Sequence, residues 1–164
     1  MLLVHFWYIL SMEFASCLKS QSELKDLFSA CSSQEMRYQK IIEMGRCLPP
    51  FDAAARLPSN LIPGCQSIMH LETRYEKGLL YFNADSEALI SKGLAALLIY
   101  VYSGEEPAVI AECPPSFIAE IGLTASLSPS RSSGLASLYH RMRQESLKFL
   151  VVQAADDGRG GHDS

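Results

Sequence analysis

The sequence predicts an α+β domain in which a small antiparallel β-sheet, formed by one hairpin, is flanked by helices. Apolar residues recur at helical spacing in the first third of the chain. Between residues 66 and 82 they recur at every second position, as in a half-buried strand, and helical spacing returns afterwards. Helices that cover a small antiparallel sheet form an α+β sandwich.

Two helices are expected before the hairpin. The first is short and covers residues 22–30. The second begins at a capping box formed by Ser32 and Glu35, and the prolines that follow Leu48 end it. Residues 51–64 contain two more prolines and show no periodicity, so we predict a loop there.

The hairpin has one strand over residues 66–75 and a second over residues 79–82, joined by a turn at Glu76, Lys77 and Gly78. Alternation places Met69, Leu71, Thr73 and Tyr75 on one face of the first strand. His70 falls on the opposite, polar face, so we predict that it is a solvent-exposed surface histidine.

A long helix follows the hairpin, and we expect Asp85 or Ser86 to cap it and Gly104 to end it. Residues 94–102 are apolar on nearly every side, which predicts that this helix is buried at the centre of the domain. Three more helices are predicted, over residues 107–113, residues 117–121 and residues 129–150.

The length of 164 residues fits one domain, which we place at residues 21–152. Residues 1–20 form an extension with an apolar run at 2–10, which is too short for the roughly 20 residues that span a bilayer. We favour a true translation start at Met12; an export signal or a short segment packed on the domain are the alternatives. Residues 153–164 are polar and glycine-rich at their end, which predicts a disordered tail.

Composition excludes several classes of protein. A net charge of −4 argues against general nucleic-acid binding and against charge-driven membrane binding. The five cysteines include no CxxC pair, so zinc-ribbon and thioredoxin-type patterns are absent, and we expect no bound metal. We interpret the cysteines as free thiols of a cytoplasmic protein.

Cys65 differs from the other four cysteines in its surroundings. It follows Pro63 and Gly64 on a loop that leads into the first strand, and glycine allows a sharp turn that leaves the sulfur uncrowded. The other four lie on helix faces or ends, where they are expected to be small buried apolar residues or incidental thiols. Cys65 is therefore the candidate reactive residue.

The residues around Cys65 belong to a set of blocks that resembles the SufE-type sulfur-acceptor proteins of iron–sulfur cluster biogenesis. The resemblance runs from about Glu23 to about Leu150. The family commonly has tryptophan in the first strand where this chain has His70. In chain order, the matching blocks are residues 37–49, 60–67, 85–94 and 127–135.

The resemblance implies that Cys65 takes sulfur, as a persulfide, from a cysteine desulfurase, stimulates that enzyme, and passes the sulfur to an iron–sulfur scaffold. The pyridoxal phosphate belongs to the desulfurase, so no cofactor is expected in this chain. By the same resemblance, Arg131 favours the Cys65 thiolate, Gln66 hydrogen-bonds the loop, and Asp85 controls how readily the loop opens or simply caps the helix. Without a partner bound, Cys65 is expected in a shallow apolar pocket with Arg131 and Asp85 nearby.

Three other functions stay open at this point. An iron–sulfur scaffold would need three converging cysteines, and a docking regulator would stimulate the desulfurase without carrying sulfur. A sulfur acceptor for another thio-transfer pathway would differ only in its partner. A homodimer is also left open.

Overall fold

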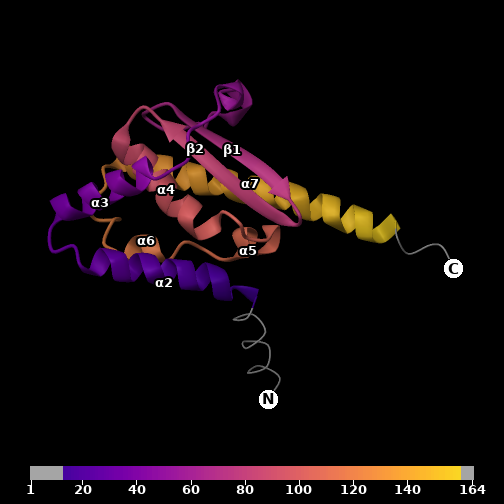
Figure 1. Cartoon of the computed structure of the whole chain (residues 1–164), viewed down its shortest axis with the longest axis horizontal. Coiled ribbons are helices and arrows are strands. Elements are labelled where there is room, and N and C mark those ends of the chain that lie inside the picture. The colour runs from indigo at the N-terminus through magenta and orange to yellow at the C-terminus, as the bar shows by residue number, and fades with distance from the viewer. Residues whose placement is uncertain (1–12, 160–164) are drawn as a thin grey trace, which may run out of the picture.

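The computed structural model describes residues 13–159 and confirms the predicted α+β domain with a hairpin flanked by helices (Figure 1). The expectations for residues 1–12 and for the end of the predicted tail lie outside the described residues. In chain order the elements are α2 (Ala15–Ser29), α3 (Gln34–Arg46), η1 (Ala53–Ala55), η2 (Pro58–Asn60), β1 (Met69–Glu76), β2 (Leu79–Ser86), α4 (Leu89–Tyr102), α5 (Pro107–Glu112), α6 (Phe117–Glu120) and α7 (Pro129–Arg159).

Strands β1 and β2 pair antiparallel, with Met69 opposite Ser86 and Glu76 opposite Leu79. Lys77 and Gly78 both have positive φ, 50° and 85°, as a two-residue hairpin turn requires. Strand β2 continues to Ser86, beyond the predicted end at Phe82, because its alternation of buried and half-buried residues continues to that point.

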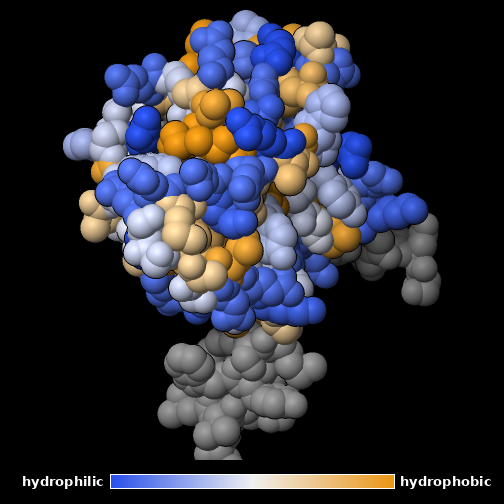
Figure 2. Space-filling model, turned by 60° about the vertical axis from the view of Figure 1, so that its left-hand side comes forward, coloured by the Kyte–Doolittle hydropathy of each residue, from blue (hydrophilic) through white to orange (hydrophobic). Residues whose placement is uncertain are grey.

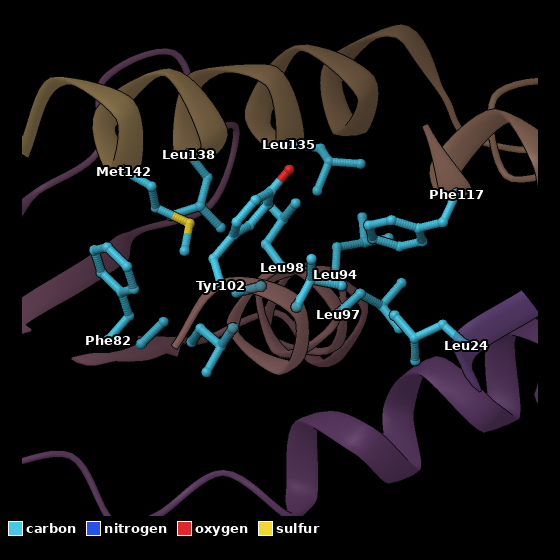
Figure 3. Close-up of a cluster of buried hydrophobic side chains, with 14 of the residues drawn as sticks. Leu24, Phe82, Leu94, Leu97, Leu98, Tyr102, Phe117, Leu135, Leu138 and Met142 are labelled. Carbon is cyan, nitrogen blue, oxygen red and sulfur yellow. The ribbon is translucent and has the colours of Figure 1, made fainter. Parts of the chain in front are cut away.

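Helix α4 lies at the centre of the molecule, as its apolar sequence predicts. It packs against α3, β2, α7 and α2, which surround it (Figure 1). Figure 3 shows the resulting core, in which Leu94, Leu97 and Leu98 of α4 face side chains from its neighbours. These partners include Leu24, Phe82, Phe117, Leu135, Leu138 and Met142.

Helices α3 and α4 cross at two glycines, Gly45 and Gly93. A Cβ atom added to Gly93 would lie 2.2 Å from the carbonyl oxygen of Ile41, and one added to Gly45 would lie 2.8 Å from the nitrogen of Gly93. The two backbones can therefore approach this closely only because neither position carries a side chain.

Two helices are longer than predicted. Helix α2 begins at Ala15, not at residue 22, because Cys17 and Gln21 extend its buried face toward the N-terminus. Helix α7 continues past Leu150 to Arg159, so residues 153–159, expected in a disordered tail, are helical. Tyr75 of β1 stacks on Phe149, at 4.6 Å between ring centroids, and its hydroxyl accepts a 2.6 Å hydrogen bond from Gln153, which holds the start of this extension against β1.

Two predicted helix caps are wrong by one or more residues. Ser33, not Ser32, caps α3, since its hydroxyl accepts a hydrogen bond from the backbone N–H of Met36. Neither Asp85 nor Ser86 caps α4, because β2 runs through both and the helix starts after Ala88. Within residues 13–159, no helix combines the length and the apolar character that crossing a membrane requires.

Candidate functional site

Cys65 lies at the tip of a turn between η2 and β1. Gly64 adopts a φ of +81°, in the left-handed region that glycine favours, and this reverses the chain immediately before the cysteine. On either side the chain is anchored, because Ile62 donates a backbone hydrogen bond to Met69 at 2.9 Å. The sequence therefore displays Cys65 on a short loop held at its base by the sheet.

The Cys65 thiol is half-buried against the first turns of α7. Its sulfur lies 3.8 Å from the carbonyl oxygen of Gly134, to which it donates a weak hydrogen bond. A Cβ atom at position 134 would come within 3.2 Å of that sulfur. Gly134 therefore provides the space into which the thiol folds.

A cavity of about 170 Å³ opens beside Cys65, between the loop, α4 and α7. Its buried lining residues are apolar, and its exposed lining residues, Gln66 and Arg131, are polar. Arg131 contributes to the lining with an exposed side chain, and Ser130 donates a 2.8 Å hydrogen bond to Gln66. The residues lining the cavity are Cys65, Gln66, Ser67, Met69, Ala88, Ser91, Leu94, Ala95, Ser130, Arg131, Gly134, Leu135 and Leu138.

The structure thus brings three of the predicted site residues, Cys65, Gln66 and Arg131, to one cavity. Gln66 was expected to hydrogen-bond within the loop; in the structure it accepts a hydrogen bond from Ser130, which ties the cysteine loop to the start of α7. Sequence reasoning missed the roles of Gly134 and Ser130 at this contact. The only signal for either was their place in the block at residues 127–135, next to Arg131.

Burial raises the pKa of the Cys65 thiol above its ordinary value. In this arrangement the neutral thiol is favoured, which keeps the sulfur poorly nucleophilic while it is tucked against α7. Desolvation is the cause of this shift, and the guanidinium of Arg131 does not offset it in this arrangement.

This burial predicts how Cys65 reacts with a small alkylating reagent. Because the pKa is raised, the rate of reaction with iodoacetamide is expected to increase with pH through a midpoint above that of a cysteine in a short unstructured peptide. The measurement is the pH profile of site-resolved alkylation by mass spectrometry. A midpoint below that of the peptide cysteine would contradict the buried, neutral state.

Gly134→Ala is expected to push the Cys65 thiol out of its pocket. The added methyl group would lie 3.2 Å from the sulfur, and the loop is the part that can move. A strain of about 0.5–1.5 kcal/mol on the folded-in thiol corresponds to a roughly two- to tenfold faster alkylation. Ser133→Ala, an exposed neighbour on the same turn, is the matched control, and an unchanged rate in Gly134→Ala would contradict this packing.

Asp85 has a different role from a helix cap. Its carboxylate lies 2.5 Å from the guanidinium of Arg56 and 3.1 Å from the ammonium of Lys92. Partial burial alone would raise the pKa of Asp85, but the hydrogen bonds from Arg56 and Lys92 outweigh it and lower that pKa. Asp85 does not line the cavity; it ties the segment containing Arg56 to the end of β2 and the start of α4.

Asp85→Asn is expected to lower the free energy of unfolding at neutral pH by up to about 1 kcal/mol, as for a network of partly exposed ion pairs. Because the pKa of Asp85 is lower in the folded state than in the unfolded state, the stabilisation by its ion pairs is fully present at a pH above the unfolded-state pKa. It is lost as the pH falls through the folded-state pKa. Urea unfolding at pH 7 measures the loss of stability, and urea unfolding near pH 2 measures its disappearance at low pH. Glu87→Gln, at an exposed position, is the control. Equal stability of Asp85→Asn and the unmodified chain at pH 7 would contradict the role.

The prediction that His70 is exposed to solvent is wrong. Only 9% of its surface is accessible, because residues 51–62 fold back over that face of β1 and Leu61 forms a bridge with His70. Its ring lies 6.1 Å from that of Phe51, over which Arg56 is placed at 5.4 Å. Periodicity within one strand did not reveal this cover, because a non-periodic loop provides it.

The other cysteines do not approach Cys65. Cys31 is buried, Cys47 is exposed, and Cys17 and Cys113 lie together where α2 meets the end of α5. Within residues 13–159, no group of three His, Cys, Asp or Glu side chains is arranged to hold a metal ion. The scaffold alternative, which requires converging cysteines, therefore has no support from this arrangement.

Comparison with known proteins places this geometry in a family. Residues 22–146 match the family model described as "SufE: Fe-S metabolism associated domain". Uncharacterized SufE-like proteins of Synechocystis and of Rhizobium etli are 30% and 34% identical, over 84% and 78% of this chain and 86% and 90% of their own lengths. SufE-like protein 1, chloroplastic/mitochondrial, of Arabidopsis thaliana is 32% identical over 87% of this chain, which corresponds to 38% of that longer protein.

A solved structure has the same fold. The solution structure of a hypothetical protein from Thermus thermophilus superposes with a TM-score of 0.68 at 25% identity, covering 80% of this chain and 96% of that one. The family match covers most of the chain, including the Cys65 loop, the central helix and the first turns of α7. The chain therefore belongs to the SufE family, whose domain is associated with iron–sulfur metabolism.

Proposed function

We propose that this protein is a sulfur acceptor that takes persulfide sulfur from a pyridoxal-phosphate-dependent cysteine desulfurase onto Cys65. The observation that supports this most directly is the placement of Cys65. It is a thiol at the tip of a loop anchored at its base, folded against a glycine and beside a cavity. Membership of an iron–sulfur metabolism family supports the same chemistry.

The transfer is an exchange between sulfur atoms and needs no external oxidant or reductant. The Cys65 thiolate attacks the outer sulfur of the desulfurase persulfide, and the sulfur–sulfur bond in the desulfurase breaks. The desulfurase cysteine leaves as a thiolate, and Cys65 becomes the persulfide. The proton that Cys65 loses before attack goes to solvent or to the leaving thiolate.

Two features of the site suit a carrier of reactive sulfur. While Cys65 is tucked against Gly134, burial favours its neutral form and restricts oxidants, which attack exposed thiolates. When the loop opens toward a partner, the desolvation ends and Arg131, on the rim of the same cavity, becomes available to stabilise the thiolate. We assign Gln66 and Asp85 to holding the loop and the adjoining segment in the closed position.

The partners follow from the chemistry. The donor is a cysteine desulfurase, which holds the cofactor, and the next acceptor is an iron–sulfur scaffold. We propose a reducing compartment such as the cytoplasm, although the Arabidopsis relative is named chloroplastic/mitochondrial. A docking regulator that carries no sulfur is the second candidate, and the test below separates the two.

The test uses sulfur label. The protein is incubated with a cysteine desulfurase and cysteine labelled with radioactive sulfur, without reductant, and separated from the desulfurase under non-reducing conditions. The expected result is label on this chain, released by dithiothreitol, at up to one sulfur per chain. Stimulated desulfurase turnover with no label on the chain would overturn the acceptor function in favour of the regulator.

A further inference from the structure

A second pair of thiols lies in the core, away from the Cys65 cavity. Cys17 of α2 and Cys113, which directly follows α5, are separated by 96 positions in the sequence. Their sulfur atoms are 3.0 Å apart, and 0% and 2% of these residues are exposed. The bond of a disulfide is about 2.05 Å, so the sulfurs need to close only about 1 Å.

Gln21 holds the pair in place from one side. This residue is buried, and its amide nitrogen lies 3.6 Å from each of the two sulfurs and 3.0 Å from the carbonyl oxygen of Pro114. Its amide oxygen accepts hydrogen bonds from Ser116 and from the backbone N–H of Phe117. One side chain therefore fixes the end of α5 against α2 and faces both thiols.

The backbone of Cys113 is fixed from the other side. The buried hydroxyl of Tyr102 donates a 2.6 Å hydrogen bond to the carbonyl oxygen of Cys113. Tyr139 of α7 directs its hydroxyl to the same oxygen at 3.4 Å. With both ends of the pair held, the sulfurs stay within reach of each other instead of separating by rotation of a loose loop.

The two thiols are not chemically equivalent. The S–H of Cys17 donates to the sulfur of Cys113, which raises the pKa of Cys17 and lowers the pKa of Cys113. A lowered pKa favours the thiolate, which is the nucleophilic form. Cys113 is therefore the member of the pair suited to react first with an oxidant.

We propose that Cys17 and Cys113 form an intramolecular disulfide when the protein meets a hydroperoxide, independently of sulfur transfer at Cys65. The thiolate of Cys113 attacks one oxygen of hydrogen peroxide; the oxygen–oxygen bond breaks, hydroxide leaves, and Cys113 becomes a sulfenic acid. The Cys17 thiol then attacks this sulfur, and the hydroxyl leaves as water with the Cys17 proton. The two cysteines are oxidised, and one peroxide is reduced to two water molecules.

The disulfide would tie α2 to the end of α5 across most of the chain. A cross-link that closes so long a loop limits the unfolded chain strongly. The expected effect is a rise of roughly 5–10 °C in the thermal midpoint of the oxidised protein, reversed by dithiothreitol. Because both residues are buried, we expect peroxide to oxidise this pair more slowly than it oxidises exposed Cys47.

The experiment uses the full chain with Cys65→Ser and Cys47→Ser, which removes the two accessible thiols. The protein is treated with hydrogen peroxide, unfolded, alkylated and digested without reduction. The expected result is a pair of peptides linked through Cys17 and Cys113. Its mass is about 2 Da, two hydrogens, below the summed mass of the two separate peptides. Cys31→Ala, at a buried cysteine outside the pair, is the matched control and retains the linkage, whereas Cys113→Ala loses both the linkage and the thermal shift.

Two results would overturn this inference. One is complete alkylation of Cys17 and Cys113 after a peroxide treatment that is strong enough to oxidise Cys47 in the unmodified chain. The other is a disulfide that joins Cys31 to either member of the pair. The peptide map of the chain that retains Cys17 and Cys113 shows whether the disulfide forms, even if Cys113→Ala folds poorly. No desulfurase is present, so failure here leaves the sulfur-acceptor function unaffected.

Discussion

Cys65→Ser is expected to reduce the turnover of a cysteine desulfurase, measured with this protein as the added partner, to the rate of the desulfurase alone. Stimulation in the proposed function arises because the acceptor thiol removes sulfur from the desulfurase cysteine. A serine hydroxyl, with no nucleophilic sulfur, cannot take part in exchange between sulfurs. The fold should be retained, because Cys65 is a half-buried loop residue and serine is similar in size.

The measurement is alanine production under saturating cysteine, with and without a mild reductant. Cys47→Ser provides the matched control, because Cys47 is also a free thiol but is exposed and lies away from the cavity, and it should stimulate like the unmodified chain. Full stimulation by Cys65→Ser would contradict sulfur acceptance as the cause and would support a docking regulator.

Gly93→Ala is expected to destabilise the protein severely. The new methyl group would lie 2.2 Å from the carbonyl oxygen and 2.4 Å from the side chain of Ile41, so α3 and α4 would have to separate. Overpacking of this kind costs about 3 kcal/mol, against a gain of about 1 kcal/mol from better helix propensity. A net loss of about 2 kcal/mol lowers the thermal midpoint by roughly 4–8 °C in a domain of this size.

Thermal unfolding followed by circular dichroism measures this loss. Gly134→Ala is the informative comparison, because it is also a glycine within a helix but faces a movable thiol instead of a neighbouring backbone. It should keep or raise the midpoint. An unchanged midpoint in Gly93→Ala would contradict the close contact between the two helices.

On the side of the molecule that Figure 2 brings forward, the described residues form no single continuous apolar face. Figure 2 shows small apolar areas separated by hydrophilic side chains on the side of the molecule that it brings forward.

Much of the fold was predictable because it depends on local periodicity. The apolar run of α4 predicted its central position, and the alternation of β1 with a glycine turn predicted the hairpin. What failed depended on contacts between distant segments. The cover over His70 and the ion pair of Asp85 with Arg56 both come from residues 51–62, whose sequence shows no periodicity.

The candidate site was predictable in part for the same reason. The turn at Gly64 and the loop position of Cys65 follow from a few adjacent residues. The face that receives the thiol comes from Gly134 on a helix far along the chain, and the pairing of Cys17 with Cys113 spans 96 positions. The spacing of residues along the sequence does not predict which distant residues come into contact, because these contacts depend on how the helices pack in the core.

The transferred sulfur is expected to reside on Cys65. The protein is incubated with a cysteine desulfurase and cysteine, alkylated under non-reducing conditions, and analysed by intact mass and peptide mapping. The expected result is a gain of about 32 Da, one sulfur atom, on the peptide that contains Cys65, and no gain in Cys65→Ser. Sulfur on another cysteine of the chain, or on none, would contradict the claim.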